Sequence, residues 1–280
     1  MVTIAQTLHD AASRFASAGI DDGRLEAEAL LAHVVSSNRT QLLARFNEPL
    51  AEAIATSFEV LIGRRLAREP LAYIVGHREF YGIDIICAPG ALIPRPETEL
   101  LVDVALGAAQ SRGATKITDV GTGTGALAIA IAVNAPDVVI TAVDASPGAL
   151  AIAATNLARY ALDTRVLLRH AHLLDGLGEF NVILANLPYI RSDGIAALQP
   201  EIREFEPLEA LDGGITGTEL MDQLLEQAPF HLAGAGILAL EVGDTQAASV
   251  AAKARDCFPD ARVCVIKDLA GFDRVVQVSR

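Results

Sequence analysis

The chain has 280 residues, of which 51% are hydrophobic and 20% charged, a composition that specifies a globular protein rather than a disordered one. Its formal net charge of −13 disfavours an extended nucleic-acid-binding surface, because proteins that bind long stretches of nucleic acid carry a basic surface. The N-terminus lacks a secretory signal pattern, no apolar run can span a membrane, and three scattered cysteines lack metal-ligand spacing, so we expect a cytoplasmic protein without a metal site.

Residues 1–75 show the apolar spacing of helices and no strand pattern. Thr3 stands where it can cap the first helix, and Gly19 stands where that helix should end. We therefore expect a small helical bundle, which recognises a partner or packs on the main domain.

Residues 76–94 change to short alternating strands around Gly82, which predict a β-hairpin linker. The segment Ile93 to Glu99 (IPRPETE) contains two prolines and leads into a predicted helix over residues 97–108. By itself this segment is also typical of an ordinary proline-rich helix start with acidic residues at the helix N-terminus.

From residue 116 onward, predicted strands and helices alternate, which indicates a mostly parallel sheet covered on both faces. The strands are predicted at residues 116–120, 138–143, 166–169, 180–185 and 236–242, and the helices at 126–133, 147–160, 220–228 and 246–258. Residues 261–267 and 274–278 predict a terminal antiparallel hairpin. We assign residues 95–280 to one α/β domain.

A glycine turn, Asp119-Val120-Gly121-Thr122-Gly123-Thr124-Gly125, follows the first of these strands. Glycines allow a tight turn and close approach of a ligand, and because Ala126 is a tolerated last residue of the dinucleotide fingerprint, that class stays possible. Asp119 favours S-adenosylmethionine instead, since a carboxylate suits its ammonium group and repels a pyrophosphate. Asp144 ends the next strand, where it can accept both ribose hydroxyls, cap the helix that starts at Pro147, or do both.

The tetrapeptide Asn186-Leu187-Pro188-Tyr189 follows the predicted strand at 180–185, at the edge where open α/β sheets bind ligands. An amide or aromatic amine nitrogen is a poor nucleophile because its lone pair is delocalised. The Asn186 side-chain oxygen and the Pro188 carbonyl can hold its N–H groups, and the Tyr189 ring can pack on its plane. Alone, the tetrapeptide is equally typical of a proline turn. Together with the glycine turn, it predicts a methyltransferase that acts on a planar nitrogen.

Over almost its whole length the sequence resembles the protein-(glutamine) methyltransferases that modify peptide chain release factors, the HemK/PrmC family. The matching segments are Leu71 to Gly76, Glu79 to Gly82, Ile93 to Glu99, Asp119 to Gly125, Asp144, Phe205 to Pro207, Ala210-Leu211, Gly213-Gly214 and Leu240 to Gly243. The linker and the Ile93 to Glu99 loop are specific to this family, whereas the glycine turn is shared by class I methyltransferases.

Three residues depart from the family pattern. Leu187 replaces a proline, and we expect function to survive because this side chain supplies no required polar group. His172 stands where many relatives carry an aspartate near the adenine amine, and a neutral histidine can still accept one hydrogen bond. Asn181 replaces a common aspartate, and we assign it no role.

The resemblance implies a helical N-terminal domain and a class I, Rossmann-like methyltransferase domain with a seven-stranded, mostly parallel sheet. It implies methyl transfer from S-adenosylmethionine to the glutamine of the Gly-Gly-Gln motif of release factors, with S-adenosylhomocysteine as product, and we expect a monomer. The cofactor contacts implied are Asp119, Gly121, Thr122, Gly123, Gly125, Asp144, His172 and Asn186. The substrate contacts implied are Arg95, Glu97, Asn186, Leu187, Pro188 and Tyr189, of which Asn186, Pro188 and Tyr189 are the catalytic residues.

Three alternatives stay open. Ribosomal RNA adenine dimethyltransferases favour Asn-Leu-Pro-Tyr, but their glycine turn lies near the N-terminus and their extra helical domain follows the catalytic one. A methyltransferase for a ribosomal-protein glutamine is a second candidate, although the Ile93 to Glu99 loop favours release factors. A non-catalytic nucleotide-binding adaptor would keep the fold without needing Asn186.

Overall fold

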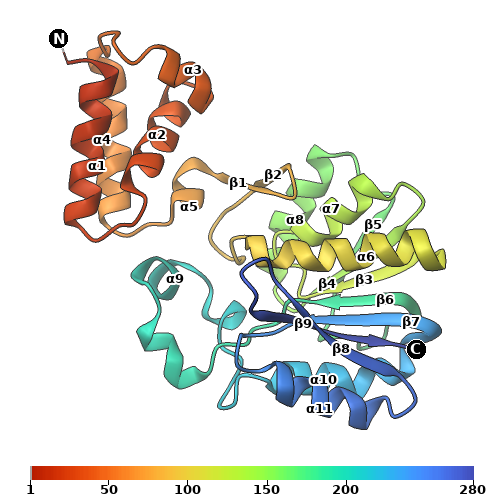
Figure 1. The fold of residues 1–280 in the computed structure, drawn as a ribbon. Helices are drawn as coiled ribbons and strands as arrows, with labels where there is room; N and C mark the ends of the chain where they lie inside the picture. The colour runs from red at the N-terminus through yellow and green to blue at the C-terminus, as the bar shows by residue number, and fades with distance from the viewer. Residues whose placement is uncertain (1) are drawn as a thin grey trace. The chain divides into compact units, whose positions relative to one another are not determined.

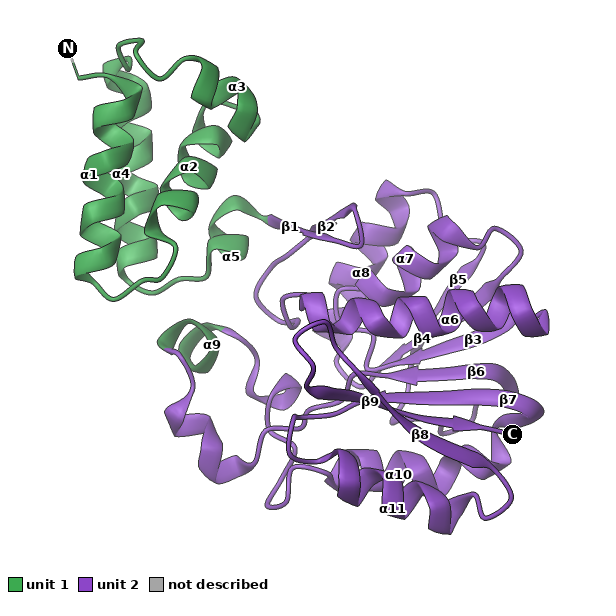
Figure 2. Ribbon diagram, in the orientation of Figure 1, with its two compact units in different colours: residues 1–76, 200–205 green, residues 77–199, 206–280 purple. Residues whose placement is uncertain are grey.

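The computed structural model describes residues 2–280, and the chain divides into two compact units (Figure 2). The first unit runs up to Gly76 and also includes Pro200–Phe205, while the second comprises His77–Gln199 and Glu206–Arg280. No helix within residues 2–280 is long and apolar enough to cross a membrane.

The first unit consists of helices, as the apolar spacing predicted. They are α1 (Ile4–Ser17), α2 (Gly23–Val34), α3 (Arg39–Ala44), α4 (Glu52–Leu66), α5 (Leu71–Val75) and α9 (Pro200–Phe205). The Thr3 cap is confirmed, because its hydroxyl accepts from the Gln6 N–H and the Gln6 side chain accepts from the Thr3 N–H. Phe15 and Phe58 are fully buried among these helices, so the unit has its own hydrophobic core.

Helix α9 lies far along the chain from the other helices of this unit. The sequence predicted one domain over residues 95–280, whereas α9 clusters with the helical unit. Glu201 of α9 accepts from the Arg65 guanidinium of α4 at 2.9 Å, and Glu26 of α2 pairs with the same guanidinium. Arg65 is only 5% exposed, and a buried cation needs such partners. Pairing between residues this distant in sequence leaves no local pattern, which is why the sequence did not predict it.

The second unit is built on a sheet of seven strands in the order β5-β4-β3-β6-β7-β9-β8 (Figure 1). The strands are β3 (Lys116–Val120), β4 (Val139–Asp144), β5 (Val166–His170), β6 (Phe180–Ala185), β7 (Leu232–Glu241), β8 (Arg262–Lys267) and β9 (Asp273–Ser279). All neighbours pair in parallel except β9, which runs antiparallel to β7 and β8. This confirms the predicted fold class and the terminal hairpin.

Helices cover both faces of the sheet (Figure 1). One face carries α6 (Glu99–Arg112), α7 (Ala126–Asn134) and α8 (Pro147–Arg159), and the other carries α10 (Glu219–Gln227) and α11 (Ala247–Cys257). Short 3-10 turns complete the unit: η1 (Pro96–Thr98), η2 (Ser192–Ala197), η3 (Leu208–Ala210) and η4 (Ala228–Phe230). Because both faces are covered, the central strands β3 and β6 are buried along most of their length, including the polar Thr118 and Asp119 of β3.

A two-stranded hairpin, β1 (His77–Phe80) with β2 (Ile83–Ile86), precedes the sheet. Its two-residue turn has positive φ at both Tyr81 and Gly82, the geometry that suits the twist of paired strands. The fully buried Asn156 of α8 accepts from the Ile86 N–H and donates to the carbonyls of Ile86 and Thr124. Asn156 therefore holds the end of the hairpin against the glycine turn.

The strand order determines where a ligand can bind. From β3 the chain proceeds to β4 and β5 on one side, and from β6 to β7 on the other, so the order reverses between β3 and β6. Open α/β sheets bind ligands beyond the carboxyl ends of the strands at such a reversal. Asp119, Asp144 and Asn186 all lie at that edge of the sheet.

Candidate active site

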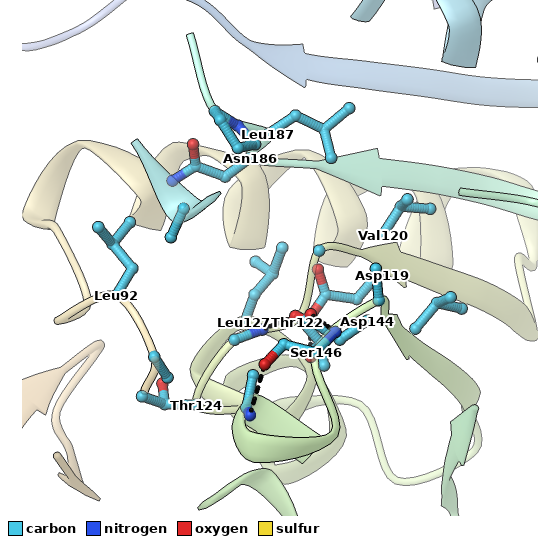
Figure 3. Close-up of a pocket in the computed structure, with 18 of the residues that line it drawn as sticks. Leu92, Asp119, Val120, Thr122, Thr124, Leu127, Asp144, Ser146, Asn186 and Leu187 are labelled. Atoms are coloured by element: carbon cyan, nitrogen blue, oxygen red, sulfur yellow. Dashed lines mark hydrogen bonds between the residues drawn. The ribbon is translucent and has the colours of Figure 1, made fainter. Parts of the chain in front are cut away.

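A cavity of about 320 Å³ lies at the carboxyl ends of β3, β4 and β6. In Figure 3, Asn186 and Leu187 stand on one side of it, while Asp119, Thr122 and Asp144 lie on the other. Most of the residues predicted from the sequence line this cavity, namely Arg95, Asp119, Gly121, Thr122, Gly123, Asp144, His172, Asn186, Leu187 and Pro188. The structure thus brings the glycine turn and the tetrapeptide to one site.

The glycine turn is fixed by its backbone. The N–H groups of Gly121 and Thr122 both donate to the Val143 carbonyl at 2.9 Å. Gly121 has φ +77°, and a Cβ there would lie 3.2 Å from the Leu187 side chain and 3.5 Å from the Asn186 carbonyl. Glycine is therefore needed at this position both for the turn and for the close approach of the tetrapeptide.

Asp119 is a buried acid at the floor of the cavity. It is 2% exposed, and its Oδ2 accepts from the Thr122 hydroxyl at 2.6 Å. Burial raises the pKa of Asp119 to about 7, and the nearby Asp144 carboxylate adds to this increase. No cation among residues 2–280 pairs with Asp119. A ligand that brings a cation to this carboxylate would stabilise its ionised form.

Asp144 presents a carboxylate at the end of β4. Its Oδ2 accepts from the Gly123 N–H and its Oδ1 from the Ser146 N–H, both at 2.8 Å. The alternative that Asp144 caps the following helix is wrong, because Ser146 is the N-cap of α8 and accepts from the Ala149 N–H. Each carboxylate oxygen still has acceptor capacity for a ligand hydroxyl.

Two residues of the tetrapeptide that line the cavity, Asn186 and Pro188, have an oxygen without a hydrogen-bond donor. The Asn186 Nδ2 donates to the Thr98 hydroxyl at 2.9 Å, while its Oδ1 accepts from no donor within residues 2–280. The Pro188 carbonyl likewise accepts no hydrogen bond from the described part of the chain. The next carbonyl, that of Tyr189, is occupied by the Gln246 Nε2 at 2.8 Å. Asn186 and Pro188 therefore offer the two oxygens that an incoming N–H₂ group requires.

Three predicted site residues do not line the cavity. Gly125 starts α7, and a Cβ there would meet the Ala153 Cβ of α8 at 3.3 Å, so its smallness serves helix packing. Glu97 is exposed outside the cavity. The Tyr189 hydroxyl lies 3.5 Å from the Glu241 carboxylate, and burial raises the pKa of Tyr189 to about 12.

Arg95 and His172 line the cavity but already have protein partners. Arg95 donates to Glu206 at 2.5 Å, and the same buried carboxylate accepts from the Ile93 N–H at 3.0 Å. Glu206 thereby fixes the loop that forms one wall of the cavity. His172 Nε2 lies 3.2 Å from Oε1 of Gln223, so it acts as the donor in that pair.

Comparisons with known proteins identify the family of this chain. Residues 6–76 match the PrmC N-terminal domain and residues 97–200 the methyltransferase small domain. The release factor glutamine methyltransferase of Geobacter sulfurreducens is 37% identical, over 98% of this chain and 95% of that protein. That of Moorella thermoacetica is 38% identical, over 98% of this chain and 97% of that protein. The chain belongs to the release factor glutamine methyltransferase family.

Solved methyltransferase structures share the fold of this family member. A methyltransferase from Pyrococcus furiosus has a TM-score of 0.51 and 18% identity, over 79% of this chain and 95% of that chain. The hMettl16 catalytic domain has a TM-score of 0.58 and 13% identity, over 76% of this chain and 81% of that chain. At these identities the likeness concerns the fold alone.

The family member is an S-adenosylmethionine-dependent methyltransferase, and the cavity suits that molecule. Asp119 is a buried acid that pairs with no cation within residues 2–280, which fits an amino acid ammonium. The Asp144 carboxylate can still accept hydrogen bonds from ribose hydroxyls. Between the two acids, Gly121 and Gly123 let a ligand approach the backbone closely because they have no side chains. These residues can hold the cofactor.

Three residues of the site, Thr98, Glu206 and Glu241, were not predicted from the sequence as individual functional residues. Thr98 donates to the Glu241 carboxylate at 2.7 Å and accepts from the Asn186 side chain. Glu206 accepts from Arg95. All three are buried. An acid inside an apolar strand, as in Leu240-Glu241-Val242, was the signal that could have indicated Glu241, because buried acids are retained where they have partners.

Proposed function

We propose that the enzyme transfers a methyl group from S-adenosylmethionine to the side-chain amide nitrogen of the glutamine in the Gly-Gly-Gln motif of peptide chain release factors. One observation carries the proposal: Asn186 and Pro188, whose side-chain and carbonyl oxygens accept no hydrogen bond within residues 2–280, line the same cavity as Asp119 and Asp144. The relatives named release factor glutamine methyltransferase, which match nearly the whole chain, support this choice of substrate.

In this proposal, the residues of β3 and β4 bind the cofactor. Asp119 pairs with the ammonium group, Asp144 accepts from the ribose hydroxyls, and His172 lies near the adenine. Bound S-adenosylmethionine supplies a methyl group on a positively charged sulfur. Because burial raises the pKa of Asp119 to about 7, pairing with a ligand cation would favour its ionised form.

The tetrapeptide positions the acceptor. The Asn186 Oδ1 and the Pro188 carbonyl accept from the two N–H bonds of the glutamine amide, which directs its nitrogen lone pair toward the methyl carbon. The C–N bond forms as the carbon–sulfur bond breaks, and the excess proton on nitrogen then leaves to water. Because the sulfonium is a strong electrophile, positioning can supply most of the acceleration without a strong base. That the Tyr189 ring packs on the amide plane stays a prediction.

Labelled S-adenosylmethionine incubated with purified release factor, ribosomal protein or ribosomal RNA tests this function. We expect label in the release factor, and a mass increase of one methyl group on the tryptic peptide that contains Gly-Gly-Gln. Label in the ribosomal protein or the RNA alone would replace this proposal by one of its alternatives.

We also propose that the enzyme acts in the cytoplasm, where translation ends, and that it is a monomer. Light scattering of the purified protein can measure its oligomeric state.

A further inference from the structure

Three side chains from distant segments form a hydrogen-bonded chain that begins at the cavity, which Asn186 and Thr98 line, and ends at Glu241 outside its lining. Asn186 follows β6, Thr98 belongs to η1, and Glu241 ends β7. The Asn186 Nδ2 donates to the Thr98 Oγ1 at 2.9 Å, and the Thr98 hydroxyl donates to the Glu241 Oε2 at 2.7 Å. Thr98 is 8% exposed and Glu241 is 1% exposed, so water competes little for these bonds.

We propose that Thr98 and Glu241 are positioning residues that fix the side-chain amide of Asn186 with its oxygen toward the substrate. This inference rests on the proposed function, in which that oxygen accepts from the glutamine amide. Neither residue needs to touch substrate or cofactor for this role, since both act through Asn186.

Counting protons explains how the chain selects one orientation of the amide. A hydroxyl has a single proton, and in Thr98 it points to the Glu241 carboxylate. The Thr98 oxygen is then only an acceptor toward Asn186. It must face the amide N–H₂ group, and the Asn186 oxygen must point the other way. The reversed amide would place two oxygens together without a proton between them, and it would offer N–H donors to a substrate that also carries N–H donors.

The charge state of Glu241 controls this arrangement. An ionised carboxylate can only accept, so it commits the Thr98 proton. A protonated Glu241 can donate to the Thr98 oxygen, and the Thr98 proton is then free to bond the Asn186 oxygen. That bond would compete with the substrate amide for the same oxygen. Burial raises the pKa of Glu241 to about 7, and the Thr98 hydroxyl opposes this increase.

The groups that face Glu241 come from several segments. Besides Thr98, the Tyr189 hydroxyl lies 3.5 Å from the Glu241 Oε1. The Arg274 charge of β9 favours the ionised form of Glu241, and the Glu97 charge of η1 disfavours it. Arg274 is itself paired with Asp268 at 3.1 Å, so it does not neutralise Glu241 alone.

Four variants test the inference, with turnover measured at saturating S-adenosylmethionine. We expect Glu241→Gln, whose amide can donate to Thr98, to lower kcat for release factor about tenfold, the effect of one misdirected hydrogen bond. Thr98→Val, which cannot bridge the two groups, should lower kcat at least fivefold, while Thr98→Ser should keep it within about twofold. KM for release factor and S-adenosylhomocysteine affinity should change little. Glu226→Gln, an exposed residue of α10, is the matched control and should behave as wild type.

Two further measurements separate positioning from a merely structural role. In an Asn186→Ala background, Glu241→Gln should cause no further loss of kcat, because the group it orients is gone. The wild-type kcat should decline below about pH 7, because Glu241 becomes protonated there. The kcat of Glu241→Gln should not decline in this way, because glutamine does not titrate. Wild-type turnover in Glu241→Gln, or an equal loss with and without Asn186, would overturn the inference.

The side-chain amide signals of Asn186 in nuclear magnetic resonance spectra give a readout that needs no substrate. They should shift in both Thr98→Val and Glu241→Gln and stay in place in Thr98→Ser. If wild-type enzyme methylates no release factor, the proposed function fails, yet shifted Asn186 signals would still support the orientation. Unchanged Asn186 signals in Thr98→Val and Glu241→Gln would overturn the orientation whatever the substrate is.

Discussion

The position of the Pro188 carbonyl can be tested through Gly213, a buried residue that packs against it. The Gly213 N–H donates to the Ile190 carbonyl at 2.8 Å, which holds the two segments side by side. A Cβ on Gly213 would lie 2.6 Å from the Pro188 oxygen, 2.7 Å from the Gly217 oxygen and 2.8 Å from the Tyr189 Cα. A carbon and a carbonyl oxygen normally approach to ~3.3–3.6 Å, so Gly213→Ala must move backbone by about 0.7–1 Å. None of these atoms belongs to a side chain that could rotate away.

Such a shift should affect turnover more than cofactor binding. A misplacement of ~1 Å at a reacting centre can cost about a hundredfold in rate, so we expect kcat for release factor to fall between tenfold and a hundredfold. Strain of this kind also costs about 1–3 kcal/mol of stability, which thermal unfolding measures. Affinity for S-adenosylhomocysteine, measured by calorimetry, should change little because Asp119 and Asp144 lie on β3 and β4. Gly234→Ala is the matched control, since a Cβ there meets nothing within 4 Å. Wild-type kcat in a folded Gly213→Ala enzyme would refute the role given to the Pro188 carbonyl.

Three other predictions concern single residues of the cavity. Because burial raises the pKa of Asp119 to about 7, S-adenosylmethionine affinity should weaken as pH falls below 7, and binding near pH 7 should release protons. Calorimetry in buffers of different ionisation enthalpy measures both effects. A pH-independent affinity would contradict the Asp119–ammonium pairing. His172→Asp should tighten cofactor binding or leave it unchanged, and a large loss in a folded variant would show that the His172–Gln223 contact has another task. Asn186→Ala should lower turnover at least tenfold with little change in cofactor affinity, since a substrate amide left unpaired costs about 1–3 kcal/mol; turnover at the wild-type rate would mean that the tetrapeptide is only a turn.

The sheet was largely predictable because its strands are short apolar segments between turns. The bounds predicted for β3 and β6 agree with those observed. Strand β7 begins at Leu232, four residues before the predicted start at residue 236. The prediction started too late because the segment 232–235 (LAGA) consists mostly of small residues and shows no alternation of apolar and polar side chains. Its register with β6 is also irregular between Phe180 and Val182, and such an irregularity leaves no sequence pattern.

The position of the cavity could be predicted from strand ends, but the supporting contacts could not. Asp119, Asp144 and Asn186 each follow from a rule about where parallel strands finish. The bond from Asn186 to Thr98 joins residues 88 positions apart, and the pair of Arg95 with Glu206 spans 111 positions. Contacts of this range depend on how the loops pack after folding, and only the three-dimensional structure reveals them.

Two buried acids of the site, Asp119 and Glu241, make the stability of the free enzyme depend on pH in a direction that can be stated. The folded-state pKa of Asp119 is raised from 3.8 to about 7, and that of Glu241 from 4.5 to about 7. A raised folded pKa means that the folded protein holds a proton which the unfolded chain releases at lower pH. The stability from each protonated acid is therefore complete below pH ~4 and lost as pH rises through 7. For Asp119, the ammonium group that the proposed function places there would reverse part of this loss, because it would stabilise the ionised carboxylate. Glu241 gains no such partner from the cofactor, and its ionised form is held by the Thr98 hydroxyl and the Arg274 charge. Burial raises the pKa of both acids, yet the two proposals couple them to different events: Asp119 to cofactor binding and Glu241 to the orientation of Asn186.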